Sequence, residues 1–391
     1  MALCTDTLQS PAMKADGRPV ASPLTSGVDI IAHERTMPSC SRLAVRRFEL
    51  DFPATRFFGS KRNLLRWLHD ILSKESFATA FEPFGGTGSV SYLLGSMGKK
   101  VWYRDIFEWL SICARVLLEK RRLVLSQAML TEFIASVRPR KGFIRNRFDG
   151  AYFVRDENEW LDGVCHSIAR MTDPSQRDQI RYLLFQASLR KRPFNLFHRQ
   201  NLALRTRTNT TRTFGNHATW DKSFPAHMSE LLQELNQYKA RHRSLATVLP
   251  AADAFSPAPR ADLVYLDPPY LAIDRRTESY LERYHFLEGM IDVDSWPSRL
   301  HEMGAKLSLN DRSEINLWSS REIFPDLLFG AIAGFSDSIV VLSYPANSEP
   351  SRKLIETFFR DTFHSVSIYQ RSRSIAMSPT RMTELVYVGR P

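Results

Sequence analysis

The chain has 391 residues, of which 43% are hydrophobic and 11% aromatic, so it can build a sizeable core and is not a wholly disordered protein. Its formal net charge of +11 favours a polyanionic partner such as nucleic acid, although a soluble protein can be basic without one. The 4 cysteines lack metal-ligand spacing and are too few for a disulfide framework, and no apolar run reaches the length of a membrane span. We therefore expect a cytoplasmic protein without a metal site or membrane contact.

The N-terminal half of the chain begins without periodicity and then alternates between helical and strand patterns. Residues 1–45 mix Ser, Pro, Thr and Gly with charges, which indicates a flexible extension. Residues 60–72 place leucine and isoleucine on one helical face, and the apolar run 77–84 is stopped by Pro and Gly as a buried strand would be. Three further elements are predicted next: a helix from 90–97, a strand over 99–105 and a helix over 111–130.

The later part of the chain contains strands rich in Val, Leu and Tyr, with helical patterns between them. They are predicted at 262–267, 338–344 and 384–389. This alternation predicts an α/β fold with a mostly parallel sheet covered by helices on both faces. Residues 141–245 carry few strand-like runs and many Arg, Asn, Thr and His residues, so we expect an inserted, mostly helical or loop region there.

A glycine-rich turn at 81–88 (Phe-Glu-Pro-Phe-Gly-Gly-Thr-Gly) joins the first predicted strand to a helix. Glycines let the backbone approach a ligand closely, and the helix N-terminus offers N–H donors, although the pattern is not the dinucleotide fingerprint. Asp105 ends the next predicted strand, where a carboxylate can accept both hydroxyls of a ribose. The simpler alternatives are a tight turn at 81–88 and a helix N-cap at Asp105.

The sequence Asp267-Pro268-Pro269-Tyr270 directly follows the strand predicted at 262–267. Two prolines rigidify the backbone, so the Asp267 carboxylate and the Pro268 carbonyl can be held as two acceptors that point the same way. An exocyclic amino group has two N–H donors in one plane, which two fixed acceptors match, and Tyr270 offers a flat face for stacking on a base. The alternative is an ordinary proline-rich turn.

These residue types suit methylation of an adenine amine. The N6 lone pair is conjugated with the ring, and acceptors on its hydrogens localise that lone pair and orient it, so that alignment supplies most of the acceleration. The base must leave the duplex to enter such a pocket. Methylation of cytosine carbon-5 needs a thiolate in a Pro-Cys pair, and none of the cysteines follows a proline.

With these motifs in this order, the chain resembles the D12-class adenine-specific DNA methyltransferases, the alpha-group family that includes Dam-like enzymes. The resemblance covers roughly residues 50–391 and starts from a lysine motif at 56–61. It departs from the family at Ser60 and Phe57, where glycine and tryptophan are frequent. The segments 284–286 and 342–344 resemble family positions that flank the pocket.

The resemblance implies a Rossmann-like fold that binds S-adenosyl-L-methionine, with residues 46–140 and 246–391 as the catalytic domain and 141–245 as the target-recognition region. It assigns catalysis to Asp267, Pro268, Pro269 and Tyr270. It assigns cofactor binding to Phe57, Gly59, Lys61, Glu82, Pro83, Phe84, Gly86, Gly88, Asp105, Ile106, Asp253, Ala254, Phe255 and Asp267.

The stretch between Asp178 and Asp221 contains no acidic residue and interleaves arginines with Asn and aromatic side chains. Such a stretch suits phosphate contacts and base-edge hydrogen bonds. The expected DNA-binding residues are Arg190, Lys191, Arg192, Arg199, Arg205, Arg207 and Arg212. Two alternatives stay open: a solvated basic face, or a segment 192–197 that packs inside the catalytic domain while the later arginines touch DNA.

The function that we expect is site-specific methylation of adenine N6 in double-stranded DNA, in a restriction–modification or orphan system. The partner would then be DNA, with a cognate restriction endonuclease in the same system, and the enzyme would act as a monomer. The alternatives are an RNA adenine methyltransferase, a protein glutamine methyltransferase, or a catalytically silent DNA-binding protein. Protein-modifying relatives carry Asn first in the motif, whereas this chain has Asp267.

Overall fold

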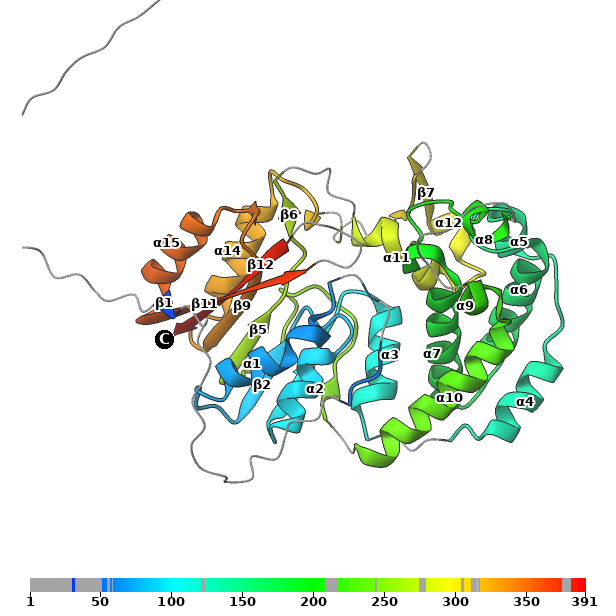
Figure 1. Ribbon diagram of the computed structural model, residues 1–391, viewed down its shortest axis with the longest axis horizontal. Coiled ribbons are helices and arrows are strands. Elements are labelled where there is room, and N and C mark those ends of the chain that lie inside the picture. Colours follow the sequence, from blue (N-terminus) through cyan, green and yellow to red (C-terminus); the bar gives the residue numbers. More distant parts are fainter. Residues whose placement is uncertain are drawn as a thin grey trace, which may run out of the picture.

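The computed structural model is described for the following residues: 30–31, 51–54, 57, 59–120, 124–207, 217–242, 245–273, 279–303, 306–310, 315, 317–374 and 381–391. Within them, an open twisted sheet with helices on both faces lies beside a lobe built mostly of helices (Figure 1). We call these parts the sheet lobe and the helical lobe. None of the helices in these ranges is both long enough and apolar enough to cross a membrane.

The sheet lobe contains an 8-stranded sheet in the order β1-β11-β12-β9-β5-β2-β3-β4. Four neighbouring pairs from β9 to β4 are parallel, and β12 pairs antiparallel with both β9 and β11. The expectation of a mostly parallel α/β sheet is therefore confirmed. The strands are β1 (Ile30–Ile31), β2 (Thr79–Glu82), β3 (Lys100–Tyr103), β4 (Thr247–Val248), β5 (Leu263–Leu266), β9 (Ile339–Pro345), β11 (Ser365–Ser374) and β12 (Arg381–Arg390).

Strand β5 shows how both faces of the sheet become buried. Leu263 and Tyr265 join one apolar cluster with the first group of helices, and Val264 and Leu266 join a second cluster with the other group. Because successive side chains of a strand point to opposite faces, a four-residue apolar run is what a doubly covered strand needs. The helices of the first group are α1 (Leu65–Leu72), α2 (Ser89–Ser96) and α3 (Glu108–Leu118), and those of the second are α14 (Phe324–Gly334) and α15 (Arg352–Thr362).

The helical lobe is assembled around the long helix α7, which packs on both α10 and α3. Its helices are α4 (Gln127–Ser136), α5 (Phe143–Arg147), α6 (Arg155–Ala169), α7 (Pro174–Lys191), α8 (Ala203–Thr206), α9 (His217–Asp221) and α10 (Phe224–Arg241). The 3-10 turn η2 (Pro193–Asn195) follows α7 directly. Contacts between α7 and α3 join this lobe to the sheet lobe.

A later segment of the chain also packs against the helical lobe, and it lies within the range 246–391 that is predicted above as part of the catalytic domain. It comprises α11 (Tyr280–Gly289), α12 (Trp296–Arg299), β7 (Leu300–Met303) and β8 (Lys306–Leu309), which lie against the helical lobe in Figure 1. Phe286 of α11 stacks on Phe197 with ring centroids 4.8 Å apart, and Trp296 lies 5.1 Å from Phe148. The sequence-based boundaries missed this packing because it joins residues more than 80 positions apart.

Two other elements differ from the sequence predictions. The helix expected over 111–130 is two helices, because Glu119 has extended backbone angles and Ser126 caps α4 by accepting a hydrogen bond from the Met129 N–H. The extension expected over 1–45 includes Ile30–Ile31, which pairs with β11 at the edge of the sheet. The other residues of that extension lie outside the described part of the chain.

Candidate active site

A pocket of about 860 Å³, including its open mouth, lies where β2, β3 and β5 end. The carboxyl ends of parallel strands meet at one edge of a sheet, which is where α/β folds bind ligands. Except for Gly88 and Phe255, every residue that the sequence assigns to catalysis or cofactor binding lines this pocket. The remaining lining residues are Ser60, Gly85, Thr87, Ser89, Val90, Phe107, Leu110, Tyr280, Ile315 and Trp318.

The glycine loop at 81–88 is held against Tyr103 of the neighbouring strand. The Tyr103 hydroxyl donates to the Gly86 carbonyl at 2.7 Å, and a Cβ added at Gly85 would lie 2.1 Å from the Tyr103 ring. Gly88 does not line the pocket among the described residues. Its φ of 77° lets the chain turn into α2, and a Cβ there would meet Leu118 at 2.9 Å, so its role is in the turn.

Asp105 follows β3, and its carboxylate holds the backbone of the glycine loop and the backbone at the start of α3. Its carboxylate accepts from the Gly86 N–H at 2.8 Å and from the Phe107 N–H at 2.9 Å. Burial raises the pKa of this carboxyl to about 6. Each carboxylate oxygen has a second lone pair, so Asp105 can still accept hydrogen bonds from a ligand in the pocket.

Glu82 ends β2 and lies beneath the glycine loop, with 2% of its surface exposed. Its carboxyl accepts hydrogen bonds from both the backbone N–H and the hydroxyl of Ser91 in α2. Burial raises the pKa of Glu82 to about 8, with smaller contributions from the negative charges of Asp267 and Asp105. Glu82 is therefore largely protonated at neutral pH in the absence of a cation in the pocket.

Asp267, at the start of the Asp-Pro-Pro-Tyr motif, is paired with a buried lysine. The Lys61 ammonium lies 2.6 Å from Asp267 Oδ1 and 3.4 Å from Glu384 Oε1 in β12. The Ser343 hydroxyl in β9 donates to the same Glu384 oxygen at 2.8 Å. Burial alone would lower the pKa of Lys61, but the two carboxylates outweigh it and raise the pKa above its ordinary value. Glu384 is a residue that the sequence reasoning missed.

The chain after Asp267 is supported from outside the sheet. Pro268 is buried, and Pro269 and Tyr270 are half-buried, with all three facing the pocket. The next strand, β6 (Leu271–Ala272), pairs antiparallel with β10 (Ser348–Glu349). This pairing anchors the backbone that carries Tyr270.

An aromatic group forms one wall of the pocket around Phe57. The Phe57 ring stacks on Tyr284 with centroids 4.9 Å apart and an interplanar angle of 11°, and on Tyr280 at 5.9 Å. Tyr280 and Tyr284 lie four residues apart on one face of α11. Tyr284 was expected to flank the pocket, and its spacing could have identified Tyr280 as well.

Trp318 forms another part of the wall, which the sequence did not indicate. Its indole Nε1 donates to Asp253 Oδ2 at 3.0 Å, and its ring meets the edge of Phe84 with centroids 4.9 Å apart. Phe255, an expected cofactor contact, is 51% exposed and stacks on Trp318 at 6.0 Å. Phe255 thus packs against Trp318 without lining the pocket among the described residues.

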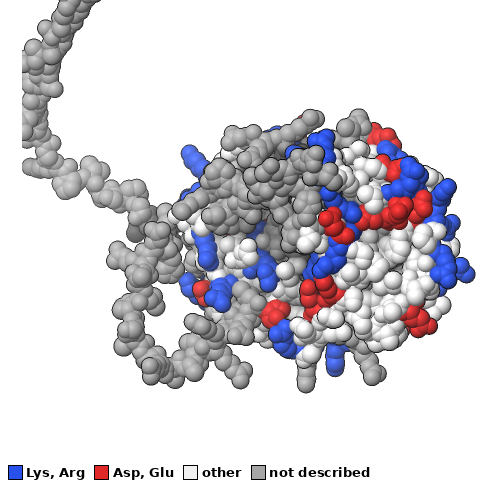
Figure 2. Space-filling model, turned by 45° about the vertical axis from the view of Figure 1, so that its right-hand side comes forward, with Lys and Arg blue, Asp and Glu red and all other residues white. Residues whose placement is uncertain are grey.

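The basic stretch between Asp178 and Asp221 divides into exposed and buried residues. Arg199 and Arg207 are exposed, and Arg190 is half-buried and pairs with Glu234 at 2.6 Å. Lys191, Arg192 and Arg205, which were also expected to contact DNA, are buried and do not present their side chains on the surface. Arg212 lies outside the described residues. On the face shown in Figure 2, basic side chains are interspersed with acidic ones and do not cover the surface evenly.

Comparison with known proteins agrees with this arrangement. The family model for the D12 class N6 adenine-specific DNA methyltransferase matches residues 57–329, which is more than half of the chain. The chain is also similar to the Type II methyltransferase M2.HphI of Haemophilus parahaemolyticus, with 25% identity over 225 residues. That match spans 56% of this chain and 66% of the relative. Together with the glycine loop and the Asp-Pro-Pro-Tyr motif on one pocket, the family match shows that the chain belongs to the D12 class N6 adenine-specific DNA methyltransferase family.

Proposed function

We propose that this protein transfers a methyl group from S-adenosyl-L-methionine to the N6 amine of adenine in double-stranded DNA. The observation that carries the proposal is that the glycine loop and the residues 267–270 open on the same pocket. One motif suits a nucleoside-containing cofactor and the other an exocyclic amine, so the two reactants would meet there. Membership of the family supports the same reaction.

The residues of the pocket fit S-adenosyl-L-methionine. A Cβ at Gly85 would collide with Tyr103, so the loop's backbone is closely packed from behind and presents its other side to the pocket. Asp105 would accept hydrogen bonds from the ribose hydroxyls, Asp253 and Trp318 would border the adenine, and Phe57 would pack by the methionine end. Acidic side chains in the pocket also suit a cationic sulfonium, which supplies the methyl group when the cofactor is bound.

The motif at 267–270 would bind the target base. Asp267 and the Pro268 carbonyl would accept the two N–H bonds of the amine, and Tyr270 would stack on the base, which must be flipped out of the duplex to reach them. The ion pair with Lys61 fixes the position of the Asp267 carboxylate at the end of β5. The amine proton would leave toward the Asp267 carboxylate or water after methyl transfer.

The exposed part of the basic stretch would contact the DNA. Arg199 and Arg207 suit phosphate contacts. Phe194, in the turn η2, is also exposed and has a φ of 63°, which is rare for a bulky residue. We further propose that the protein acts in the cytoplasm as a monomer in a restriction–modification or orphan system. The Type II methyltransferase name of the relative supports the first of these two systems, in which a restriction endonuclease would share the recognition site.

Expression in a bacterial host without adenine methylation tests this function. Genomic DNA from cells that express the wild-type chain should contain N6-methyldeoxyadenosine after digestion to nucleosides, and DNA from cells that express Asp267→Asn should not. If both DNAs lack the modified nucleoside although both proteins are soluble and bind the cofactor, the proposed function is wrong.

A further inference from the structure

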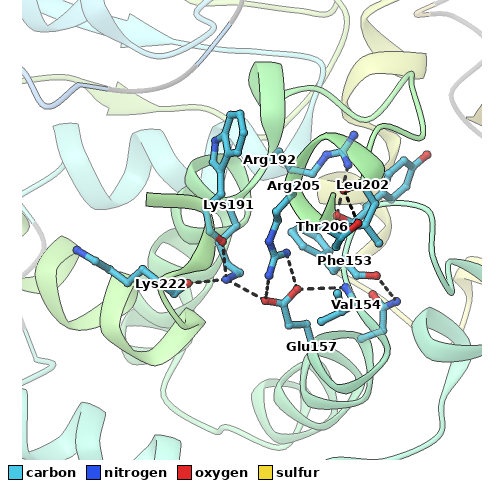
Figure 3. Close-up of polar contacts among 12 residues, drawn as sticks. Phe153, Val154, Glu157, Lys191, Arg192, Leu202, Arg205, Thr206 and Lys222 are labelled. Atoms are coloured by element: carbon cyan, nitrogen blue, oxygen red, sulfur yellow. Dashed lines mark hydrogen bonds and ion pairs between the residues drawn. The ribbon is translucent and has the colours of Figure 1, made fainter. Parts of the chain in front are cut away.

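The chain that follows α7 is anchored by buried polar contacts at both of its ends. We call residues 193–207 the recognition segment, because they carry Phe194, Arg199 and Arg207 on the surface. The segment contains no acidic residue. The three basic residues that were expected on DNA but are buried instead lie at its two ends, as Figure 3 shows for Lys191, Arg192 and Arg205.

The start of the segment is shaped by Arg192, whose side chain is fully buried. Its guanidinium donates to the carbonyls of Leu196 at 2.8 Å and Arg199 at 2.7 Å. It also lies over the Tyr152 ring, 4.6 Å from the centroid. A planar guanidinium that bonds carbonyls four and seven residues ahead fixes the path of the intervening backbone. The position of the exposed Arg199 therefore depends on a buried arginine.

The end of the segment is held by one carboxylate, Glu157 in the first turn of α6. Arg205 donates to both Glu157 oxygens, at 2.6 and 2.5 Å, and Lys191 Nζ lies 2.9 Å from Oε1 (Figure 3). The Val154 N–H donates to the same carboxylate at 3.2 Å, which ties it to the helix N-terminus. Lys191, just before the segment, and Arg205, near its end, thus converge on Glu157.

We infer that Glu157 is a positioning residue for DNA recognition, which sets the conformation of the recognition segment without touching DNA. The expected effect of Glu157 on DNA methylation rests on the proposed function. Its expected effect on the conformation of the recognition segment does not. Removing a partner from a largely buried, hydrogen-bonded ion cluster leaves unpaired charges, so the cluster would rearrange and release the end of the segment. Through its charge alone, Glu157 would oppose the binding of DNA phosphates.

The direction in which each variant changes DNA affinity distinguishes a positioning role from an effect of net charge. Glu157→Gln removes a negative charge and Arg205→Gln removes a positive one. If the cluster acts through net charge, the two variants should change DNA affinity in opposite directions. If it positions the segment, both should lower the methylation rate at the wild-type site by about tenfold or more, as misplacement of contacts does. Glu159→Gln is the matched control, because Glu159 lies on the same helix but pairs with Arg145 at 3.2 Å.

The first readout is amide hydrogen exchange of the full chain without DNA. In Glu157→Gln and Arg205→Gln, the amides of residues 193–207 should exchange about tenfold faster or more, and in Glu159→Gln they should match wild type. Unchanged exchange in both cluster variants would overturn the inference. If one variant does not fold, as judged by cofactor binding and circular dichroism, the exchange rates of the other variant decide whether Glu157 positions the segment.

The second readout is the methylation rate on a duplex that contains the recognition site, which is first mapped by sequencing genomic DNA methylated by the wild-type protein. DNA affinity is measured separately on a random-sequence duplex. We expect slower methylation for both variants, with any change in random-duplex affinity in the same direction for both. Opposite changes in affinity with normal methylation would overturn the inference. If the wild-type protein methylates no DNA, the proposed function fails, and the exchange experiment still judges the role of Glu157 in positioning the segment.

Discussion

The ammonium of Lys61 lies 2.6 Å from Asp267 Oδ1, although the two residues are 206 positions apart in the chain. Lys61 begins the 3-10 turn η1 (Lys61–Leu64), and Asp267 follows β5. Glu384 in strand β12 lies 3.4 Å from the same ammonium. The orientation of the motif's carboxylate is thus determined jointly by three distant segments, and the first predictions concern this group.

Replacing Asp267 by asparagine should abolish methyl transfer while cofactor binding is largely retained. The amide keeps the shape of the side chain but loses the negative charge that would localise the lone pair of the amine, so we expect kcat to fall on the order of 100-fold or more. Cofactor affinity, measured by isothermal titration calorimetry, should change by less than about threefold. A variant that keeps near-normal kcat would contradict the role given to Asp267.

Replacing Lys61 by methionine should destabilise the protein, because it leaves two carboxylates without their shared cation. We expect the free energy of unfolding to fall by about 3–5 kcal/mol, as for other buried ion pairs that lose one partner. The double variant Lys61→Met with Glu384→Gln should recover part of this loss, since one of the uncompensated charges is gone. Denaturant unfolding of the four proteins in the cycle measures the coupling. Strictly additive losses would show that Glu384 does not share the charge of Lys61.

Cofactor affinity should fall as the pH is lowered through about 6. Burial raises the pKa of Asp105 to about 6, so its carboxylate is ionised above this pH and protonated below it, where it is a poorer acceptor for ribose hydroxyls. Burial raises the pKa of Glu82 to about 8, so without a ligand this carboxyl is already largely protonated over the range in which Asp105 titrates. Calorimetric titrations at pH 5, 6 and 7 should show this loss in wild type. Asp105→Asn should bind more weakly and with little pH dependence, and a steep dependence in that variant would assign the titration elsewhere.

Trp318 should contribute to cofactor binding both as a wall and as a hydrogen-bond donor to Asp253. Trp318→Phe keeps the wall and loses the N–H, which should weaken cofactor binding by about fivefold. Trp318→Ala loses both and should weaken it by about a further tenfold. Phe255→Ala is the control, because Phe255 packs on Trp318 and is 51% exposed. If Phe255→Ala weakened binding as much as Trp318→Ala, the pocket would extend to Phe255.

The exposed and buried arginines of the basic stretch should behave differently. Arg199→Ala and Arg207→Ala should each lower the slope of log Kd against log salt by about 0.9, measured on a random-sequence duplex, with normal thermal stability. Arg192→Met should instead lower the melting temperature, because it removes hydrogen bonds to the carbonyls of Leu196 and Arg199. An unchanged salt slope in both surface variants would place the DNA interface elsewhere.

Most of the site could be predicted from the sequence because its residues follow strands. The glycine loop, Asp105 and Asp267 come directly after β2, β3 and β5, and the ends of adjacent parallel strands must lie together. Glu384 and Trp318 could not be predicted this way. Glu384 lies within the antiparallel strand β12, and its approach to Lys61 depends on the sheet order.

Burial was the other property that the sequence did not reveal. Lys191, Arg192 and Arg199 lie within nine residues of each other and have the same charge, yet two are buried and one is exposed. Composition predicts that such a stretch is basic, but burial depends on partners such as Glu157 and Tyr152, which come from other elements. The same limit explains why the aromatic packing of Phe286 on Phe197 was missed.

Identification of the methylated nucleoside tests most directly whether adenine N6 in DNA accepts the methyl group. Purified protein would be incubated with S-adenosyl-L-methionine labelled in its methyl group and with unmethylated bacterial genomic DNA, which is then digested to nucleosides and separated. We expect label in N6-methyldeoxyadenosine with the wild-type protein and none with Asp267→Asn. Label in N4-methyldeoxycytidine, or label on RNA or protein but not on DNA, would contradict this expectation.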